Sequence, residues 1–132
     1  MTHEIGLRRT LDMDYETALA RLPAALGTEG FGVLTQIDVR DTLRAKLGVE
    51  FRRYKILGAC NPRLAHEALG HDLAVGVMLP CNVVVYEDGP RTQVLAVDPL
   101  QTLAARDPAL QPVAEQVRAK LVRVLDSLDA AR

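Results

Sequence analysis

The chain has 132 residues, a formal net charge of −1 from 16 basic and 17 acidic residues, and 48% hydrophobic against 25% charged residues. This balance is typical of a soluble globular protein and excludes a disordered or low-complexity chain. The length suits one domain spanning residues 1–132. Because the opposite charges nearly cancel and are spread along the chain, we expect no nucleic-acid partner.

Targeting and membrane segments are not predicted. No run reaches the roughly 18 apolar residues of a membrane span, and the N-terminal stretch MTHEIGLRR lacks the apolar centre of a signal peptide. We therefore expect a cytoplasmic protein with no membrane contact. In that compartment the two cysteines are expected to be reduced thiols and not a structural disulfide.

The first half of the chain alternates predicted strands and helices. Apolar β-branched residues predict strands, and residues such as Asp and Asn before an apolar stripe predict helix starts. The strand at 31–39 is apolar on both sides in part, which predicts a largely covered strand. The expected elements are a strand at 4–11, a helix from Asp12 or Asp14 to Gly27, a strand at 31–39, a short helix from Asp38 or Asp41 to Gly48 and a strand at 54–60.

The second half predicts a hairpin followed by a long helix. The valine run within 83–87 indicates a central strand at least partly covered on both faces. The expected elements are a helix capped by Asn61 and ending at Gly70, an extended segment or short strand at 73–79, a hairpin of 83–87 with 92–97, a short helix from Asp98 to about Arg106 and a helix of about five turns at 110–128.

The apolar stripe of this last helix is the clearest pattern in the sequence. It consists of Leu110, Val113, Ala114, Val117, Leu121, Val124, Leu125 and Leu128. The alternating first half is compatible with parallel βαβ units, whereas the hairpin and the long helix favour an antiparallel sheet. We predict the second arrangement: an α+β fold with a mainly antiparallel, curved sheet, helices packed on one side and the C-terminal helix lying across it.

Two Cys-Asn dipeptides stand out between Tyr54 and Glu87, because they contain the only cysteines and the only asparagines of the chain. Cys60 ends one predicted strand and Cys81 begins another, so antiparallel neighbours bring both to the same end of the sheet. We expect a register with Cys60 opposite Cys81, which also pairs Ile56 with Val85, Leu57 with Val84 and Lys55 with Tyr86.

This end of the sheet supports two interpretations. The helix that begins at Pro62 aims free N–H groups at it, which would stabilise a reactive thiolate at Cys60. Alternatively, both cysteines are small buried apolar residues, with Asn61 and Asn82 serving a helix cap and a turn. A disulfide would need Cα atoms within about 7 Å. Zinc would need four ligands, and only His66 and His71 are near in sequence, so no metal or other cofactor is expected.

The stretches FGVLTQIDV, LRAKLG, YKILGACNPRLAHEAL, LPCNVVVYED and AVDP resemble the domain of unknown function 302 family over about residues 5–105. The resemblance implies a compact α+β domain of the helix-grip, TATA-binding-protein-like kind, in a bacterial or archaeal cytosolic homodimer. It implies no reaction, because the family has no established activity. The family pattern is present at Lys55, Cys60, Asn61, Pro62, Pro80, Cys81, Asn82, Glu87, Asp98 and Pro99.

The leading hypothesis is a non-enzymatic homodimer that binds a small molecule around the two Cys-Asn pairs or beneath the 110–128 helix. The candidate ligand-binding residues are Lys55, Cys60, Asn61, Cys81, Asn82 and Glu87. The alternative is a thiol-based redox or sulfur-handling enzyme, with Cys60 as the nucleophile and Cys81 as its resolving partner. A purely structural subunit is the third possibility.

Overall fold

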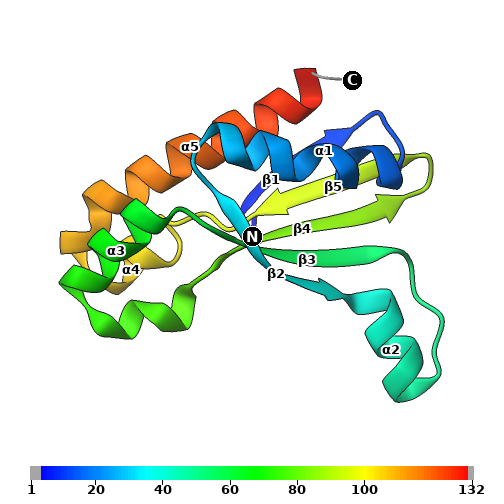
Figure 1. Ribbon diagram of the computed structural model, residues 1–132, viewed down its shortest axis with the longest axis horizontal. Coiled ribbons are helices and arrows are strands. Elements are labelled where there is room, and N and C mark those ends of the chain that lie inside the picture. The colour runs from blue at the N-terminus through cyan, green and yellow to red at the C-terminus, as the bar shows by residue number, and fades with distance from the viewer. Residues whose placement is uncertain (1–3, 131–132) are drawn as a thin grey trace.

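A five-stranded antiparallel sheet with the long helices α1 and α5 on one face forms the protein in the computed structural model, which describes residues 4–130 (Figure 1). This confirms the predicted α+β fold. The elements are β1 Leu7–Leu11, α1 Tyr15–Thr28, β2 Gly32–Asp38, α2 Val39–Leu47, β3 Tyr54–Cys60, α3 Pro62–His71, η1 Leu73–Met78, β4 Cys81–Asp88, β5 Arg91–Ala96, α4 Leu103–Arg106, η2 Pro108–Leu110 and α5 Gln111–Ala130.

The strand order in the sheet is β1-β5-β4-β3-β2, and every neighbouring pair is antiparallel. The parallel βαβ alternative is therefore wrong. The predicted hairpin is β4 with β5, and β4 lies at the centre of the sheet. Its outward-facing Val84 is half-buried, whereas Val83 and Val85 are buried beneath the helices. The valine run is thus covered on one face and partly covered on the other.

Helices α1 and α5 cover one face of the sheet, which we call the inner face; the opposite face is the outer face (Figure 1). All eight residues of the predicted C-terminal stripe are buried, as are Tyr15, Ala18, Leu22 and Leu26 of α1. They pack with the inward side chains of the sheet in a single apolar cluster. Burial of these apolar surfaces is the main stabilising term of the fold.

The predicted helix starts follow from side-chain caps. The Asp14 carboxylate accepts a hydrogen bond from the Thr17 backbone N–H at 2.8 Å, and Asp38 accepts one from the Asp41 N–H at 2.9 Å. Each cap satisfies an N–H group that has no partner within its helix. Gly48 then ends α2 in the left-handed region, at φ 67°.

Leu73–Met78 form a 3-10 helix, and only Leu79 is extended, so the expected extended segment or short strand at 73–79 is wrong. Asp72 starts this helix by accepting a hydrogen bond from the Ala74 N–H at 2.9 Å. The local cap therefore decides the conformation.

Strand β2 is an exposed edge strand, so the expectation of a largely covered strand at 31–39 is also wrong. It pairs only with β3, and its apolar residues Leu34 and Ile37 are 67% and 50% exposed. Helix α1 contacts β2, and Val33 is partly buried against the core, but Leu34 and Ile37 stay exposed. These two apolar residues are thus not explained by the core of one chain.

Within residues 4–130, no helix has both the length and the apolar character needed to cross a membrane.

Candidate functional site

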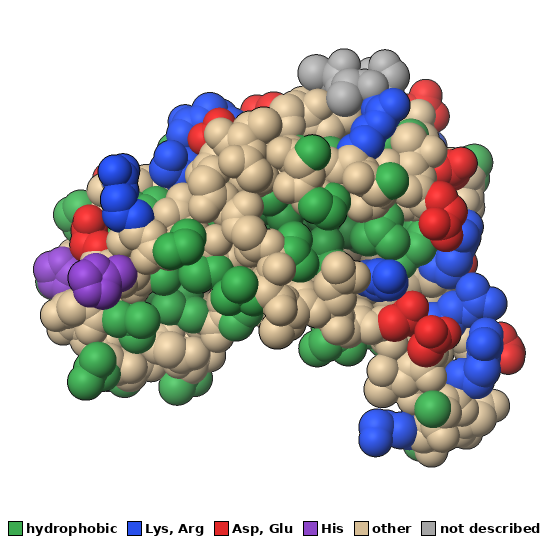
Figure 2. All heavy atoms as spheres, in the orientation of Figure 1, with side chains coloured by type: hydrophobic (Ala, Val, Ile, Leu, Met, Phe, Trp, Pro, Cys, Tyr) green, Lys and Arg blue, Asp and Glu red, His purple; other side chains and the backbone are tan. Residues whose placement is uncertain are grey.

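A cavity of about 250 Å³ lies at the end of the sheet where β3 and β4 meet α3 and η1. We call it the thiol cavity, since both cysteines line it. Figure 2 shows hydrophobic side chains gathered over this end of the molecule. The other main lining residues come from several elements and include Phe31, Ala59, Leu64, Ala68, Leu103 and Val117.

The cavity exists because small residues occupy positions where larger ones would fill it. Ala59, Ala65, Ala68 and Gly76 all line it. Among the described residues, no charged side chain takes part in the lining, and Asn61 contributes its only amide. Such a site selects a ligand by shape and apolar contact, with few polar groups to fix its orientation.

Cys60 and Cys81 meet at this cavity, but not in the predicted register. Cys81 lies opposite Ala59, so the expected pairing of Cys60 with Cys81 is wrong by one residue. The reason is the inner face, where Leu57 and Ala59 pack in line with the buried side chains of β4. Both thiols still line the cavity, because Cys60 is the last residue of β3 before the chain turns into α3.

The two thiols differ in environment. Cys81 is buried, and burial, with a smaller contribution from neighbouring Cys60, raises its pKa to about 11. Near neutral pH it is therefore a protonated thiol and a weak nucleophile. Cys60 is half-buried, and both cysteines are free. Of the two, Cys60 is the more accessible to a reagent in solution.

Asn61 has a structural role that occupies its side chain. Its Oδ1 accepts a hydrogen bond from the Leu64 N–H at 3.3 Å, and its Nδ2 donates to the Glu29 carbonyl at 3.1 Å. Gly30, at φ 83°, passes so close that a Cβ there would lie 3.1 Å from Nδ2. Asn61 therefore caps α3 and ties it to the end of α1, as its predicted capping role requires.

Asn82 does not lie in the thiol cavity. It follows Cys81 in β4, and successive side chains of a strand point to opposite faces of the sheet. The Asn82 side chain is exposed and lines a separate hollow on the outer face. The two Cys-Asn dipeptides therefore do not form a single cluster.

Lys55 and Glu87 lie at the far end of the sheet. Lys55 and Cys60 are five positions apart along β3, which is about 17 Å at roughly 3.3 Å per residue. Lys55 lines a small hollow of about 150 Å³ beside α1 and α2. Glu87 accepts hydrogen bonds from the Arg53 backbone N–H at 2.9 Å and the Arg53 Nε at 3.1 Å, which lower its pKa below the usual value. The structure thus groups three of the six candidates: Cys60, Asn61 and Cys81.

Sequence reasoning missed most of the apolar lining. Val117 belongs to the helix beneath which a ligand was predicted, but Phe31 and Leu103 were not singled out. A signal was available in the alanines of α3, because Ala65 and Ala68 sit at helical spacing toward the sheet. Residues 4–130 contain no group of three or more His, Cys, Asp or Glu side chains that could hold a metal ion.

Residues 7–128 match the profile of the family described as "Domain of unknown function DUF302". The chain belongs to the DUF302 family. It is similar to the crystal structure of an uncharacterised conserved DUF302 protein from Bacillus stearothermophilus, with 33% sequence identity and a TM-score of 0.86 over 94% of this chain and 98% of that chain. No functionally curated protein matches the chain.

For this DUF302 chain, the comparisons add a family and a fold but no reaction. The chemistry must therefore be argued from the thiol cavity itself, which offers an apolar lining, one half-buried thiol and one buried thiol.

Proposed function

We propose that this DUF302 protein is a cytoplasmic homodimer that binds a small apolar molecule in the thiol cavity and catalyses no reaction there. The observation that carries the proposal is an apolar cavity of about 250 Å³ whose lining, among the described residues, has no charged side chain. The raised pKa of Cys81 supports a binding role, because a protonated thiol contributes apolar surface and not a nucleophile. The two free cysteines fit a reducing compartment.

The cavity volume indicates the size of the ligand. An apolar cavity of roughly 150 Å³ is enough to hold benzene, whereas drug-sized ligands occupy pockets of about 300–1,000 Å³. A cavity of about 250 Å³ therefore suits a molecule the size of a substituted benzene. Val117 brings α5 into the lining, so a ligand here would contact both the sheet and the long helix, as the helix-grip resemblance leads us to expect.

Ethylbenzene is a suitable probe for the cavity. On titration with it, we expect the methyl NMR signals of Leu64, Leu103 and Val117 to shift together and the melting temperature to rise, since a ligand that binds only the folded state stabilises it. The variant Ala68→Leu fills the cavity from α3, where Ala68 is buried. We expect it to weaken ethylbenzene binding at least tenfold.

The matched control is Ala105→Leu, the same change at an exposed position in α4. It should bind ethylbenzene as the unmodified protein does. Equal binding by Ala68→Leu, or no response of the cavity methyl groups to ethylbenzene, would contradict the proposal.

A thiol-based redox or sulfur-handling enzyme is the second candidate, and it is favoured by one observation: both thiols line the same cavity. In such an enzyme Cys60 would attack and Cys81 would resolve the intermediate, so both would have to react in the folded state. The burial and the raised pKa of Cys81 argue against this second step.

Alkylation rates separate the two candidates. With iodoacetamide at pH 7.5, we expect Cys60 to be modified at least ten times faster than Cys81 in the folded protein, because Cys81 is buried and protonated. Peptide mass spectrometry reads each site, and the difference should vanish in concentrated urea. Comparable rates in the folded state would favour the enzyme over the binding protein.

A further inference from the structure

The outer face of the sheet carries an apolar row that the described helices leave open. Ile37, Ile56, Val84 and Leu95 lie opposite one another across β2, β3, β4 and β5, and the row ends at Arg8 on β1. The three central residues are half-buried, and Ile37 is exposed. An apolar row of this extent on an open sheet face is typical of an interaction surface.

A hollow of about 520 Å³ adjoins this row on the same face. Val84 and Leu95 belong to both, and Tyr54 and Tyr86 form the aromatic part of the hollow with their rings stacked at 5.4 Å between centroids. Ile5, which is 78% exposed, stands at its rim. We call this site the outer-face hollow.

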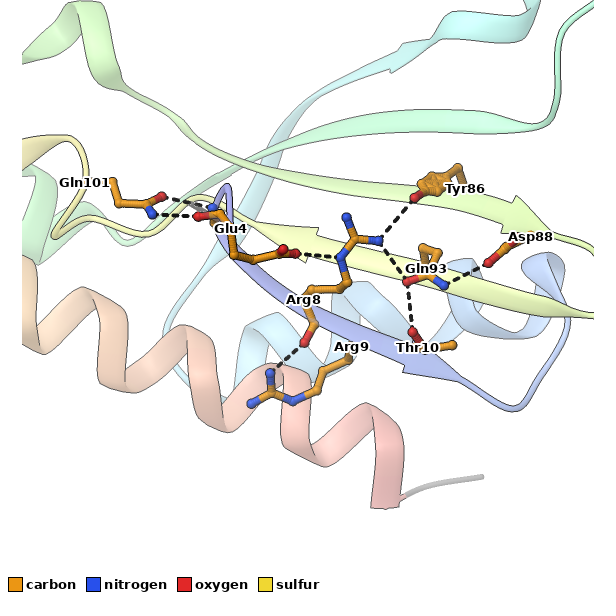
Figure 3. A network of polar contacts seen from close by, with 9 residues as sticks. Glu4, Arg8, Arg9, Thr10, Tyr86, Asp88, Gln93 and Gln101 are labelled. Carbon is orange, nitrogen blue, oxygen red and sulfur yellow. Dashed lines mark hydrogen bonds and ion pairs between the residues drawn. The ribbon is translucent and has the colours of Figure 1, made fainter. Parts of the chain in front are cut away.

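The polar side chains beside the hollow are hydrogen-bonded to one another (Figure 3). Arg8 donates to Tyr86 and to Gln93 at 3.3 Å each, Thr10 donates to Gln93 at 3.0 Å, and Gln93 donates to Asp88 at 2.9 Å. Covering a polar group is costly when it loses its hydrogen-bond partner. A partner can therefore cover this part of the face without leaving these groups unpaired.

Residues 39–53, which comprise α2 and the loop to β3, form a projection that we call the arm. Figure 1 shows the arm on the side of the sheet opposite to α1 and α5, and Figure 2 shows it separated from the rest of the molecule by a notch. No residue of α2, all of which the structure describes, is buried. Leu47 is 69% exposed and Phe51 42% exposed. A helix with apolar residues normally buries them against another element.

The arm and the outer-face hollow form one continuous surface. The Phe51 ring lies 6.1 Å from the Tyr54 ring, and Tyr54 stacks on Tyr86 within the hollow. The guanidinium group of Arg52 lies 5.8 Å from the centre of the Tyr86 ring. One chain therefore presents both an apolar projection and an apolar hollow beside it.

We propose that the arm of one copy lies in the outer-face hollow of a second copy, and reciprocally, so that the two form a symmetric dimer. This rests on the homodimer of the proposed function and names its surface. A two-fold interface uses the same patch on both subunits, which this pairing of projection and hollow provides. Charge also favours a second copy, because the arm has five basic and two acidic residues, and among the described residues that line the hollow the charged one is the acidic Asp98.

Sedimentation velocity tests the proposal with two variants. The arm variant carries Leu47→Glu and Phe51→Glu, both at exposed positions; the face variant carries Ile5→Glu and the shape-conserving Val84→Thr. We expect the unmodified protein to be a dimer and each variant to raise the dimer dissociation constant at least tenfold. Circular dichroism checks that each variant remains folded.

Mixing the two variants tests the reciprocal geometry. In an equimolar mixture, the intact arm of the face variant meets the intact hollow of the arm variant, so we expect more dimer than either variant forms alone. The control variant carries Leu73→Glu and Val77→Glu, which change exposed apolar residues of η1 away from this face, and it should remain as dimeric as the unmodified protein.

The outcomes are distinct. A dimer that neither variant weakens, or a mixture that recovers no dimer, overturns the proposed surface but leaves the homodimer in place. An unmodified protein that is monomeric, with the face free or covered by a different molecule, overturns both the surface and the homodimer. Ethylbenzene binding is measured separately, so the fate of the thiol cavity does not depend on these results.

Discussion

Gly58→Ala is expected to lower the free energy of unfolding by about 1–3 kcal/mol, the usual range for overpacking a filled region. Gly58 is buried on β3, opposite Asn82 on β4 and Thr35 on β2. A Cβ at this position would lie 2.7 Å from the Pro80 Cγ and closer still to the Thr35 Oγ1. The proline ring cannot rotate away, so the sheet must shift. Urea denaturation measures the loss.

Two further variants make this prediction specific. Gly70→Ala in α3 meets nothing within 4 Å and is expected to be neutral or to stabilise by up to about 1 kcal/mol, since alanine favours a helix more than glycine does. Adding Thr35→Ala to Gly58→Ala removes one of the two clashing groups and should restore part of the loss. A Gly58→Ala protein as stable as the unmodified one would show that the close approach of Pro80 is not a constraint.

The β3–β4 register was predicted one residue out because both faces of these strands carry apolar residues. The middle of each segment, 56–57 and 83–85, is apolar, so the predicted pairing of Ile56 with Val85 and the observed pairing of Ile56 with Val84 both match apolar residues. A one-residue slip moves every side chain to the other face, and burial of one face normally selects the register. Here the outer face also carries apolar residues, so the pattern does not distinguish the two. The position of Gly58 against Pro80 depends on tertiary contacts.

Local patterns predicted most helices, although the short helix expected from Asp98 begins only at Leu103. The apolar stripe of the C-terminal helix was predicted completely, because apolar residues recur on one side of a long amphipathic helix at every turn. The cap at Asn61 was also predicted, and Asp14 and Asp38 were each one of two predicted candidates, since a cap depends on a contact within a few residues. The candidate site was harder, because the lining of the thiol cavity comes from segments far apart in the sequence.

Strand β2 was predicted to be covered but is an exposed edge strand, and this difference has a physical explanation. Its apolar residues look like those of a buried strand, yet in the single chain they lie at the edge of the sheet. Exposed apolar edge strands favour association with another chain. Ile37 belongs to the open apolar row of the outer face, so the failure of this prediction is what the proposed dimer would produce.

Alkaline pH is expected to destabilise the protein through Cys81. The thiol pKa is raised from 9.0 to about 11 in the folded protein. Below about pH 9 the thiol is protonated in both states. Between about pH 9 and 11 the unfolded chain loses this proton while the folded protein keeps it, so unfolding becomes easier. The two-unit shift corresponds to roughly 2–3 kcal/mol of stability that is present below pH 9 and lost by about pH 11.

Comparison with Cys81→Ala isolates this effect. Tyr15, whose burial raises its pKa to about 12, is present in both proteins, so its contribution cancels in the difference. With a reducing agent present, the stability advantage of the unmodified protein over Cys81→Ala should shrink by roughly 2–3 kcal/mol between pH 8.5 and 11. Cys60→Ala keeps the buried Cys81 and should follow the unmodified protein closely, because burial is the larger cause of the shift. If the curves for the unmodified protein and Cys81→Ala stay parallel, the Cys81 thiol is in contact with water, and the apolar lining proposed to bind a ligand is not closed around it.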